Sequence, residues 1–221
     1  MEVGLVIYAL LVFGLLAVCD NDYSKTWYLR FKVISSLAFI LFYLIFSGRG
    51  LIIALLACGC GDVFMALYHL KAKKVYMFLG ILAFMAGHVF LLIYMCSDFG
   101  PTAPIVFIIP IIVCLLMLAI YKGFHLHMGR LFYAAIIYCY FVSAMATKAI
   151  EIGVGAISQA KELLIPLLIM IAGILFFLSD FSIMIMYFYH FHNKRTKRLV
   201  HYFDLITYYT AMILFVISSV K

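Results

Sequence analysis

The chain has very little charge for its length. Only 11% of its 221 residues are charged, whereas 68% are hydrophobic and 17% are aromatic. A soluble domain of this size cannot bury so much apolar surface. Disordered chains have the opposite composition, being rich in charge and poor in aromatic residues. The shortage of charge therefore excludes both classes and indicates a protein of the lipid bilayer.

The alternation of polar and apolar residues that a membrane β-barrel needs is also missing. The sequence instead holds continuous apolar runs of about the length that a helix needs to cross a ~30 Å hydrocarbon layer. The first run follows Glu2 with no basic segment before it, so we expect it to stay as a helix and not to be a cleaved signal peptide. We predict an all-α polytopic helical bundle with eight transmembrane helices, a single integral membrane domain over 1–221, with helices at about 3–19, 32–47, 51–68, 76–96, 104–121, 131–147, 163–189 and 202–219.

Lysine and arginine are scarce in every second loop. Of the 16 such residues, twelve lie in the first, third, fifth and seventh predicted loops. The other four are Arg49, Lys148, Lys161 and Lys221. Because short basic loops stay in the cytoplasm, we predict a multi-pass protein of the cell membrane with both termini on the non-cytoplasmic side. The formal charge of +7 is then explained by topology and not by nucleic-acid binding. The basic run 194–198 is expected to contact membrane lipids.

Patterns for metal ions and disulfides are missing as well. The six cysteines lie in or at the edges of apolar runs without a CxxC motif, so we interpret them as packing residues. His125 with His127, and His190 with His192, have the spacing of metal ligands but stand beside Lys or Arg, without an acidic or thiol partner. We expect no metal site and no cofactor.

Few ionisable residues lie inside the apolar runs, where a charge costs roughly 2.5–3.5 kcal/mol at the bilayer centre. They include Asp62 in the third run, His88 in the fourth and Asp180 in the seventh. The third and seventh helices run in the same direction by loop parity, so both carboxylates are expected at similar depth, toward the cytoplasmic end. Each Asp follows a small residue, Gly61 or Ser179, which lets a neighbouring helix approach.

Two carboxylates at matched depth have several uses. Each can hydrogen-bond a neighbouring helix, or the pair can carry protons or cations, or serve as the acid and base of a reaction. His88 is consistent with holding a proton, orienting a carboxylate or packing. Further polar residues, for which interhelical hydrogen bonding is the simpler interpretation, are Tyr140, Ser143, Thr147, Asp204 and Tyr208.

With these residues the sequence resembles the YhhN-type lysoplasmalogenase family of eight-helix membrane proteins, in motifs that occur in the family's order over roughly 30–215. One departure is Met212, where the family usually has Gln. The matching pieces are Gly61-Asp62-Val63-Phe64, Gly80, Phe84, Gly87-His88, Tyr138, Met145-Ala146, Gly173, Phe176, Ser179-Asp180 and Thr207-Tyr208-Tyr209.

The resemblance implies an ether hydrolase that cleaves the vinyl-ether bond of lysoplasmalogens to a fatty aldehyde and a glycerophospho-alcohol. Vinyl ethers are cleaved by protonation of the β-carbon, which needs a carboxylic acid and a carboxylate. We expect Asp62 and Asp180 to be this catalytic pair, with either one as the acid. The residues expected to support catalysis or to bind the lysophospholipid are Lys32, His88, Tyr138, Ser179 and Tyr208.

Lys32 is expected at the cytoplasmic start of the second helix. There it fits two roles. It can bind the lipid's phosphate, or it can be one of the basic residues that keep a loop on the cytoplasmic side. No feature of the sequence predicts an oligomeric state.

Two alternatives remain from the sequence. Gly59-Cys60-Gly61-Asp62 reads as the GxGD element of intramembrane aspartyl proteases, but in presenilin-like enzymes that element lies on the later catalytic helix and a Pro-Ala-Leu element follows. Here it is on the earlier Asp helix, and only Pro166-Leu167 is found, before Asp180. A proton-coupled lipid transporter or a lipid-binding bundle is the other alternative, although no clear internal repeat is visible.

Overall fold

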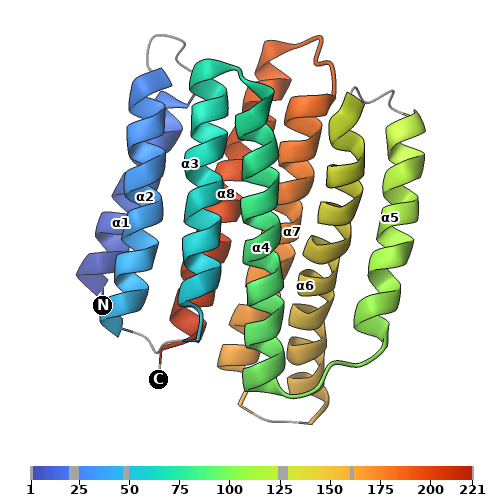
Figure 1. The fold of residues 1–221 in the computed structure, drawn as a ribbon. Helices are drawn as coiled ribbons and strands as arrows, with labels where there is room; N and C mark the ends of the chain where they lie inside the picture. Colours follow the sequence, from blue (N-terminus) through green and yellow to red (C-terminus); the bar gives the residue numbers. More distant parts are fainter. Residues whose placement is uncertain (1, 20–24, 47–49, 124–128, 160–161, 221) are drawn as a thin grey trace.

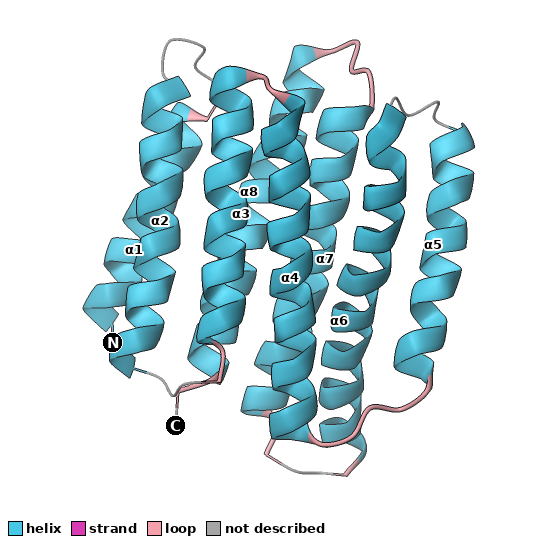
Figure 2. Cartoon of the chain, in the orientation of Figure 1, coloured by secondary structure: helices cyan, strands magenta, loops and turns pink. Residues whose placement is uncertain are grey.

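The computed structural model describes residues 2–19, 25–46, 50–123, 129–159 and 162–220. Within these ranges the secondary structure is helical and contains no strand (Figure 2). The short 3-10 helix η2 (Gly129–Leu131) precedes α6. The α-helices are α1 (Glu2–Val18), α2 (Lys25–Phe46), α3 (Ile52–Lys71), α4 (Lys74–Phe99), α5 (Ile105–Gly123), α6 (Phe132–Ser158), α7 (Leu164–Phe188) and α8 (Lys194–Ser218).

Seven of these helices, α2 to α8, are long and apolar enough to cross a membrane. The helix α1 is apolar too but has only 17 residues, the lower end of the range of about 17–25 that spans a bilayer. The predicted polytopic helical bundle is thus confirmed, and seven of the eight predicted spans meet this criterion.

Successive helices run up and down the bundle, so that α1 begins and α8 ends at the same end (Figure 1). The chain folds back on itself: α8 packs against α7 and also contacts α1 and α2. On the other side α4 packs against α3 and α6, while α5 lies at the edge and packs against α6 (Figure 1). This order brings α2, α3, α4, α6, α7 and α8 around one interior.

Glycine lets α3 and α4 pack closely. A Cβ atom added at Gly61 would lie 2.8 Å from the ring of Phe84, and one added at Gly87 would lie 2.5 Å from Sγ of Cys58. Only a hydrogen atom fits at either position. The expectation that Gly61 permits a close helix contact beside Asp62 is confirmed.

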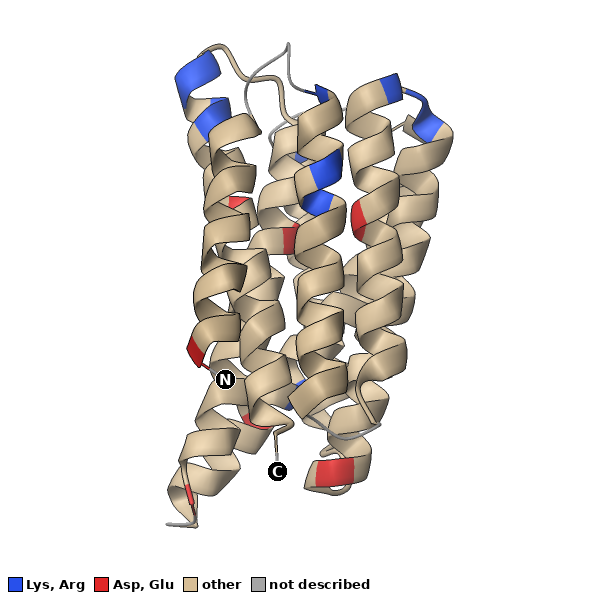
Figure 3. Cartoon of the chain, turned by 90° about the vertical axis from the view of Figure 1, so that its left-hand side faces the viewer, with Lys and Arg blue, Asp and Glu red and all other residues tan. Residues whose placement is uncertain are grey.

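The basic residues gather at one end of the bundle (Figure 3). This end carries the connection between α3 and α4, with Lys71 and Lys73, and the start of α8, with Lys194 and Arg195. Both ends of the chain lie at the opposite end. The loops that are rich in Lys and Arg therefore lie at one end of the bundle, and the chain ends lie at the other.

Three helices extend well beyond their predicted bounds, by about two turns or more. The helix α2 begins at Lys25 and not at 32, α8 begins at Lys194 and not at 202, and α6 continues to Ser158 instead of ending at 147. Hydropathy identifies the part of a helix that suits hydrocarbon, whereas backbone hydrogen bonding continues into polar sequence. At α8 the side chain of Asn193 caps the helix by accepting a hydrogen bond from the N–H of Arg195 at 2.8 Å.

One consequence is that Lys148 lies inside α6, so its predicted place in a loop is wrong. Its side chain is 2% exposed. The ammonium donates to the carbonyl oxygens of Gly100 and Pro101, at 3.2 and 3.1 Å, and lies 3.3 Å from Glu151. Lys148 thereby ties α6 to the connection between α4 and α5, because these acceptors compensate its burial.

Candidate active site

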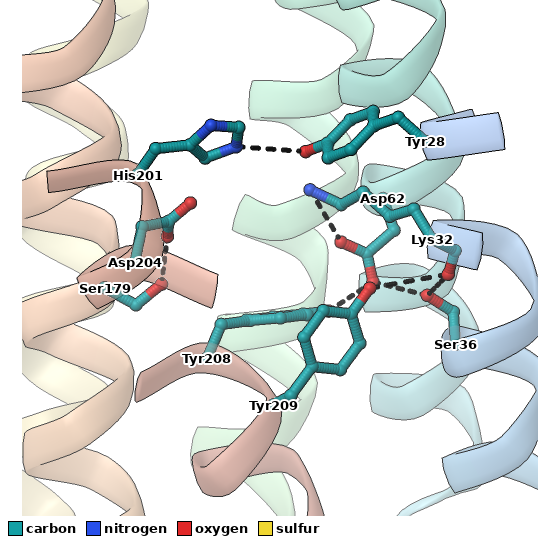
Figure 4. A network of polar contacts seen from close by, with 9 residues as sticks. All are labelled: Tyr28, Lys32, Ser36, Asp62, Ser179, His201, Asp204, Tyr208 and Tyr209. Carbon is teal, nitrogen blue, oxygen red and sulfur yellow. Dashed lines mark hydrogen bonds and ion pairs between the residues drawn. The ribbon is translucent and has the colours of Figure 1, made fainter. Parts of the chain in front are cut away.

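Asp62 is completely buried near the middle of α3. Its Oδ1 lies 3.4 Å from the ammonium of Lys32 on α2. Its Oδ2 accepts hydrogen bonds from the hydroxyl groups of Ser36 at 2.6 Å and of Tyr208 on α8 at 2.8 Å (Figure 4). Two helices, α2 and α8, therefore direct three donors at one carboxylate, and the ion pair with Lys32 is electrically neutral. Ser36 was not identified from the sequence, because a serine inside an apolar run carries no distinctive pattern.

The predicted position of Lys32 at the start of the second helix is wrong. Because α2 begins at Lys25, Lys32 lies about two turns inside it and is only 5% exposed. Its ammonium contacts Asp62 and also lies 5.8 Å from the centre of the Tyr28 ring. Both roles considered for Lys32 assumed a residue at the helix start. The structure makes it the partner of a buried carboxylate.

Asp180 on α7 forms a second polar centre with residues of α4 and α6. Its Oδ2 lies 2.9 Å from Nε2 of His88, and this nitrogen lies 3.1 Å from the hydroxyl of Tyr138. The side chain of His88 is completely buried and that of Asp180 is 4% exposed. Nδ1 of His88 has no hydrogen-bond partner among the described residues. His88 thus contacts a buried carboxylate and a hydroxyl group besides packing in the core.

A third buried carboxylate, that of Asp204 on α8, lies in the same interior. Its Oδ1 accepts a hydrogen bond from the hydroxyl of Ser179 at 2.7 Å. Asp204 also interacts electrostatically with Lys32, Asp62 and Asp180. In the sequence it was noted only as a polar residue four positions before Tyr208. That spacing, which places both on one face of α8, was the available signal.

Aromatic rings lie between the first two centres. The ring of Tyr208, whose hydroxyl contacts Asp62, lies 5.3 Å from that of Phe176, and the Phe176 ring lies 4.5 Å from that of His88. No direct contact joins Asp62 to Asp180 among the described residues. Their depths nevertheless match as predicted: Asp62 stands nine positions before the end of α3 at Lys71, and Asp180 eight before the end of α7 at Phe188.

An apolar cavity of about 460 Å³ adjoins Asp180. It lies among α4, α5, α6 and α7, and its walls include Ile81, Met117, Val142 and Phe177. Asp180, Tyr138 and Cys139 also belong to this lining, which is otherwise apolar. A cavity of this kind suits a hydrocarbon chain that carries one reactive group.

Acidic and basic side chains gather in this interior. The carboxylates are those of Asp62, Asp180 and Asp204, and the basic groups beside them are the ammonium of Lys32 and the imidazoles of His88 and His201. Because an uncompensated charge away from water is costly, each of these groups depends on its neighbours for charge compensation.

Other predicted polar features are local. Ser143 and Thr147 donate to carbonyl oxygens four residues earlier in α6, so they serve their own helix and not an interhelical contact. All six cysteines are free. In the part of the chain that the structure describes, no group of three His, Cys, Asp or Glu side chains could hold a metal ion. His125 and His127 lie outside the described residues.

Comparison with known proteins gives one match. No curated protein and no solved structure matches the chain. The family model that does match covers residues 27–219, a range that includes all three buried aspartates together with Lys32, His88 and Tyr138. The chain therefore belongs to the YhhN family.

Proposed function

We propose that this protein is an intramembrane hydrolase that cleaves the vinyl-ether bond of lysoplasmalogens. The YhhN family, to which the chain belongs, includes lysoplasmalogenases. The observation that carries the proposal is the position of Asp180, a buried carboxyl group in the wall of an apolar cavity, in contact with His88. A single-chain lipid offers both an apolar tail for such a cavity and an acid-labile bond near its end.

Asp180 is the proposed acid. It transfers a proton to the β-carbon of the alkenyl group, and the double bond supplies the electron pair for the new C–H bond. An oxocarbenium ion results, and the carboxylate left on Asp180 stabilises it. His88, 2.9 Å away, orients Asp180, and Tyr138 positions His88.

Asp62 supplies a fixed negative charge. It faces an ammonium and two hydroxyl donors, which are partners that stabilise a carboxylate. This charge favours a cationic intermediate in the same interior.

Water completes the reaction. It adds to the oxocarbenium carbon and loses a proton, which gives a hemiacetal. The hemiacetal then collapses: its hydroxyl loses a proton, the glycerol oxygen gains one, and the carbon–oxygen bond to glycerol breaks. The sum is one vinyl ether and one water converted to one aldehyde and one alcohol.

The test is mass spectrometry of purified protein incubated with three lysolipids of equal chain length, carrying a 1-alkenyl, a 1-acyl or a 1-alkyl chain. Aldehyde is expected from the alkenyl lipid alone, because neither counterpart has a carbon that accepts a proton. Carbon protonation in the rate-determining step also predicts a clear solvent deuterium isotope effect. All three lipids should bind, since tail burial of about 0.8 kcal/mol per CH₂ is common to them.

The alternatives give different results in the same preparation. Hydrolysis of the acyl lipid at a comparable rate, or cleavage of a transmembrane peptide bearing no vinyl ether, would contradict the proposal. Binding of all lipids without any product from folded protein would favour a lipid carrier, and proton-coupled lipid flux in vesicles would then identify a transporter.

A further inference from the structure

Asp204 has an environment that neither of the other buried aspartates has. Asp62 faces three donors and Asp180 faces the His88–Tyr138 pair. Asp204 is 3% exposed, and among the described residues Ser179 is the one side chain that donates a hydrogen bond to its carboxylate. In Figure 4 its second oxygen points away from Ser179, toward the space that the Lys32 ammonium also faces. This oxygen is available to another proton donor.

The position of Asp204 links the two sides of the interior. Ser179, its donor, directly precedes Asp180 on α7, whereas Tyr208, one turn later on α8, contacts Asp62. Asp204 also interacts electrostatically with Lys32 and with both other aspartates. Asp204 therefore contacts the residue that precedes the proposed acid, and among the described residues it takes no part in the contacts of Asp180 with His88.

Hydration of an oxocarbenium ion needs a base as well as an acid, because the attacking water must lose a proton. Asp62 is occupied by its three donors, and the carboxylate left on Asp180 is engaged in stabilising the cation. A separate carboxylate close to the acid is the arrangement that acid–base hydrolysis of acetal-like bonds uses, with room for a water between the two groups.

We propose that Asp204 is the base that takes the proton of the attacking water, a role that rests on the proposed vinyl-ether hydrolysis. In the balanced step, the water oxygen forms a bond to the oxocarbenium carbon while one water proton passes to the carboxylate of Asp204. That proton is then available for the glycerol oxygen when the hemiacetal collapses. Ser179 is a positioning residue, because it holds Oδ1 of Asp204.

The test follows hydrogen exchange in substrate that has not reacted. In D₂O the wild-type protein should give aldehyde with deuterium at the protonated carbon and leave the remaining alkenyl lipid unlabelled, since water captures each cation at once. In Asp204→Asn the cation should persist longer, and after rotation about its carbon–carbon bond it should often lose the original hydrogen of that carbon to Asp180, so that the deuterium stays behind. We therefore expect aldehyde release to fall roughly 100-fold, with deuterium accumulating at the vinylic β-carbon of recovered substrate.

The controls separate this role from a loss of structure. Asp180→Asn should show neither aldehyde nor exchange, and Asp98→Asn, the same change at an exposed site at the end of α4, should behave like the wild type. Ser179→Ala keeps the Asp204 carboxylate and removes its hydrogen bond, so it should show a smaller loss and weaker exchange. This variant provides the test if Asp204→Asn does not fold.

Two failures are distinguishable. If the wild-type protein yields neither aldehyde nor exchange, the proposed function is wrong. If the wild type is active but folded Asp204→Asn, or Ser179→Ala in its place, releases aldehyde at the wild-type rate or leaves the recovered lipid free of deuterium, the role of Asp204 is wrong.

Discussion

The two sides of the interior use the same residue type in contrasting surroundings. Asp62 is enclosed by polar partners from α2 and α8, whereas Asp180 has partners from α4 and α6 and borders an apolar cavity. The first arrangement fixes a charge and leaves little room for a ligand. The second brings a carboxyl group to the place where a hydrocarbon chain fits. Burial alone thus does not define the role of an intramembrane aspartate; its donors and the adjoining space do.

The largest effect should come from removing either carboxylate. Asp62→Asn and Asp180→Asn should each lower aldehyde release by roughly 100-fold or more, because asparagine keeps the size of the side chain but cannot exchange the proton or carry the charge. Both variants should remain folded and bind lysolipid, as measured by thermal unfolding in detergent. Near-normal turnover in either would remove that aspartate from the reaction.

The next effect separates charge balance from chemistry on the Asp62 side. Lys32→Met leaves Asp62 buried without its cation, which should lower the free energy of unfolding by roughly 3–5 kcal/mol. Adding Asp62→Asn should restore much of the unfolding temperature without restoring turnover. The exposed Lys197→Met on α8 is the matched control. Equal melting temperatures for the single and double variants would show that the ion pair is not needed for stability.

A smaller effect is expected from filling the cavity on the Asp180 side. Ala135 lines the cavity, whereas the neighbouring Ala134 does not, so Ala135→Phe and Ala134→Phe form a matched pair. Displacing two CH₂ groups of a bound tail costs about 1.6 kcal/mol, which is roughly a tenfold increase in KM. The increase should appear for long-chain alkenyl lysolipids and vanish for short ones. If Ala135→Phe left KM unchanged at every chain length, the tail would have to bind elsewhere.

The last prediction concerns which end of the bundle faces the cytoplasm. The substitutions that test it should leave activity unchanged. Single cysteines are introduced into a Cys-free variant of the protein, which is then labelled in intact cells with an impermeant thiol reagent. Cysteines at 71–74 and 194–198 should be shielded from the reagent, while one at 98–102 should react. The reason is that basic loops remain in the cytoplasm. The reverse labelling would invert the bundle and place all three aspartates nearer the exterior.

Much of the fold follows from local sequence properties. Apolar runs predicted the helices, because crossing hydrocarbon requires length and hydropathy that are visible in any window of about 20 residues. Their bounds were less accurate where helices continue into polar sequence, as at Lys25 and Lys194. The matched depth of Asp62 and Asp180 could also be predicted, since depth follows from counting along a helix with a rise of about 1.5 Å per residue. Family membership followed from ordered motifs and is confirmed.

What the sequence by itself determined is therefore the helices, their alternation and the depth of each ionisable residue. Only the tertiary structure decided which groups meet: Lys32 with Asp62, His88 with Asp180, and Ser179 with Asp204. The same holds for the cavity beside Asp180, whose walls come from four helices. The physical reason is that depth depends on position along one helix, whereas a contact depends on how two helices are rotated and packed against each other, which no single segment encodes.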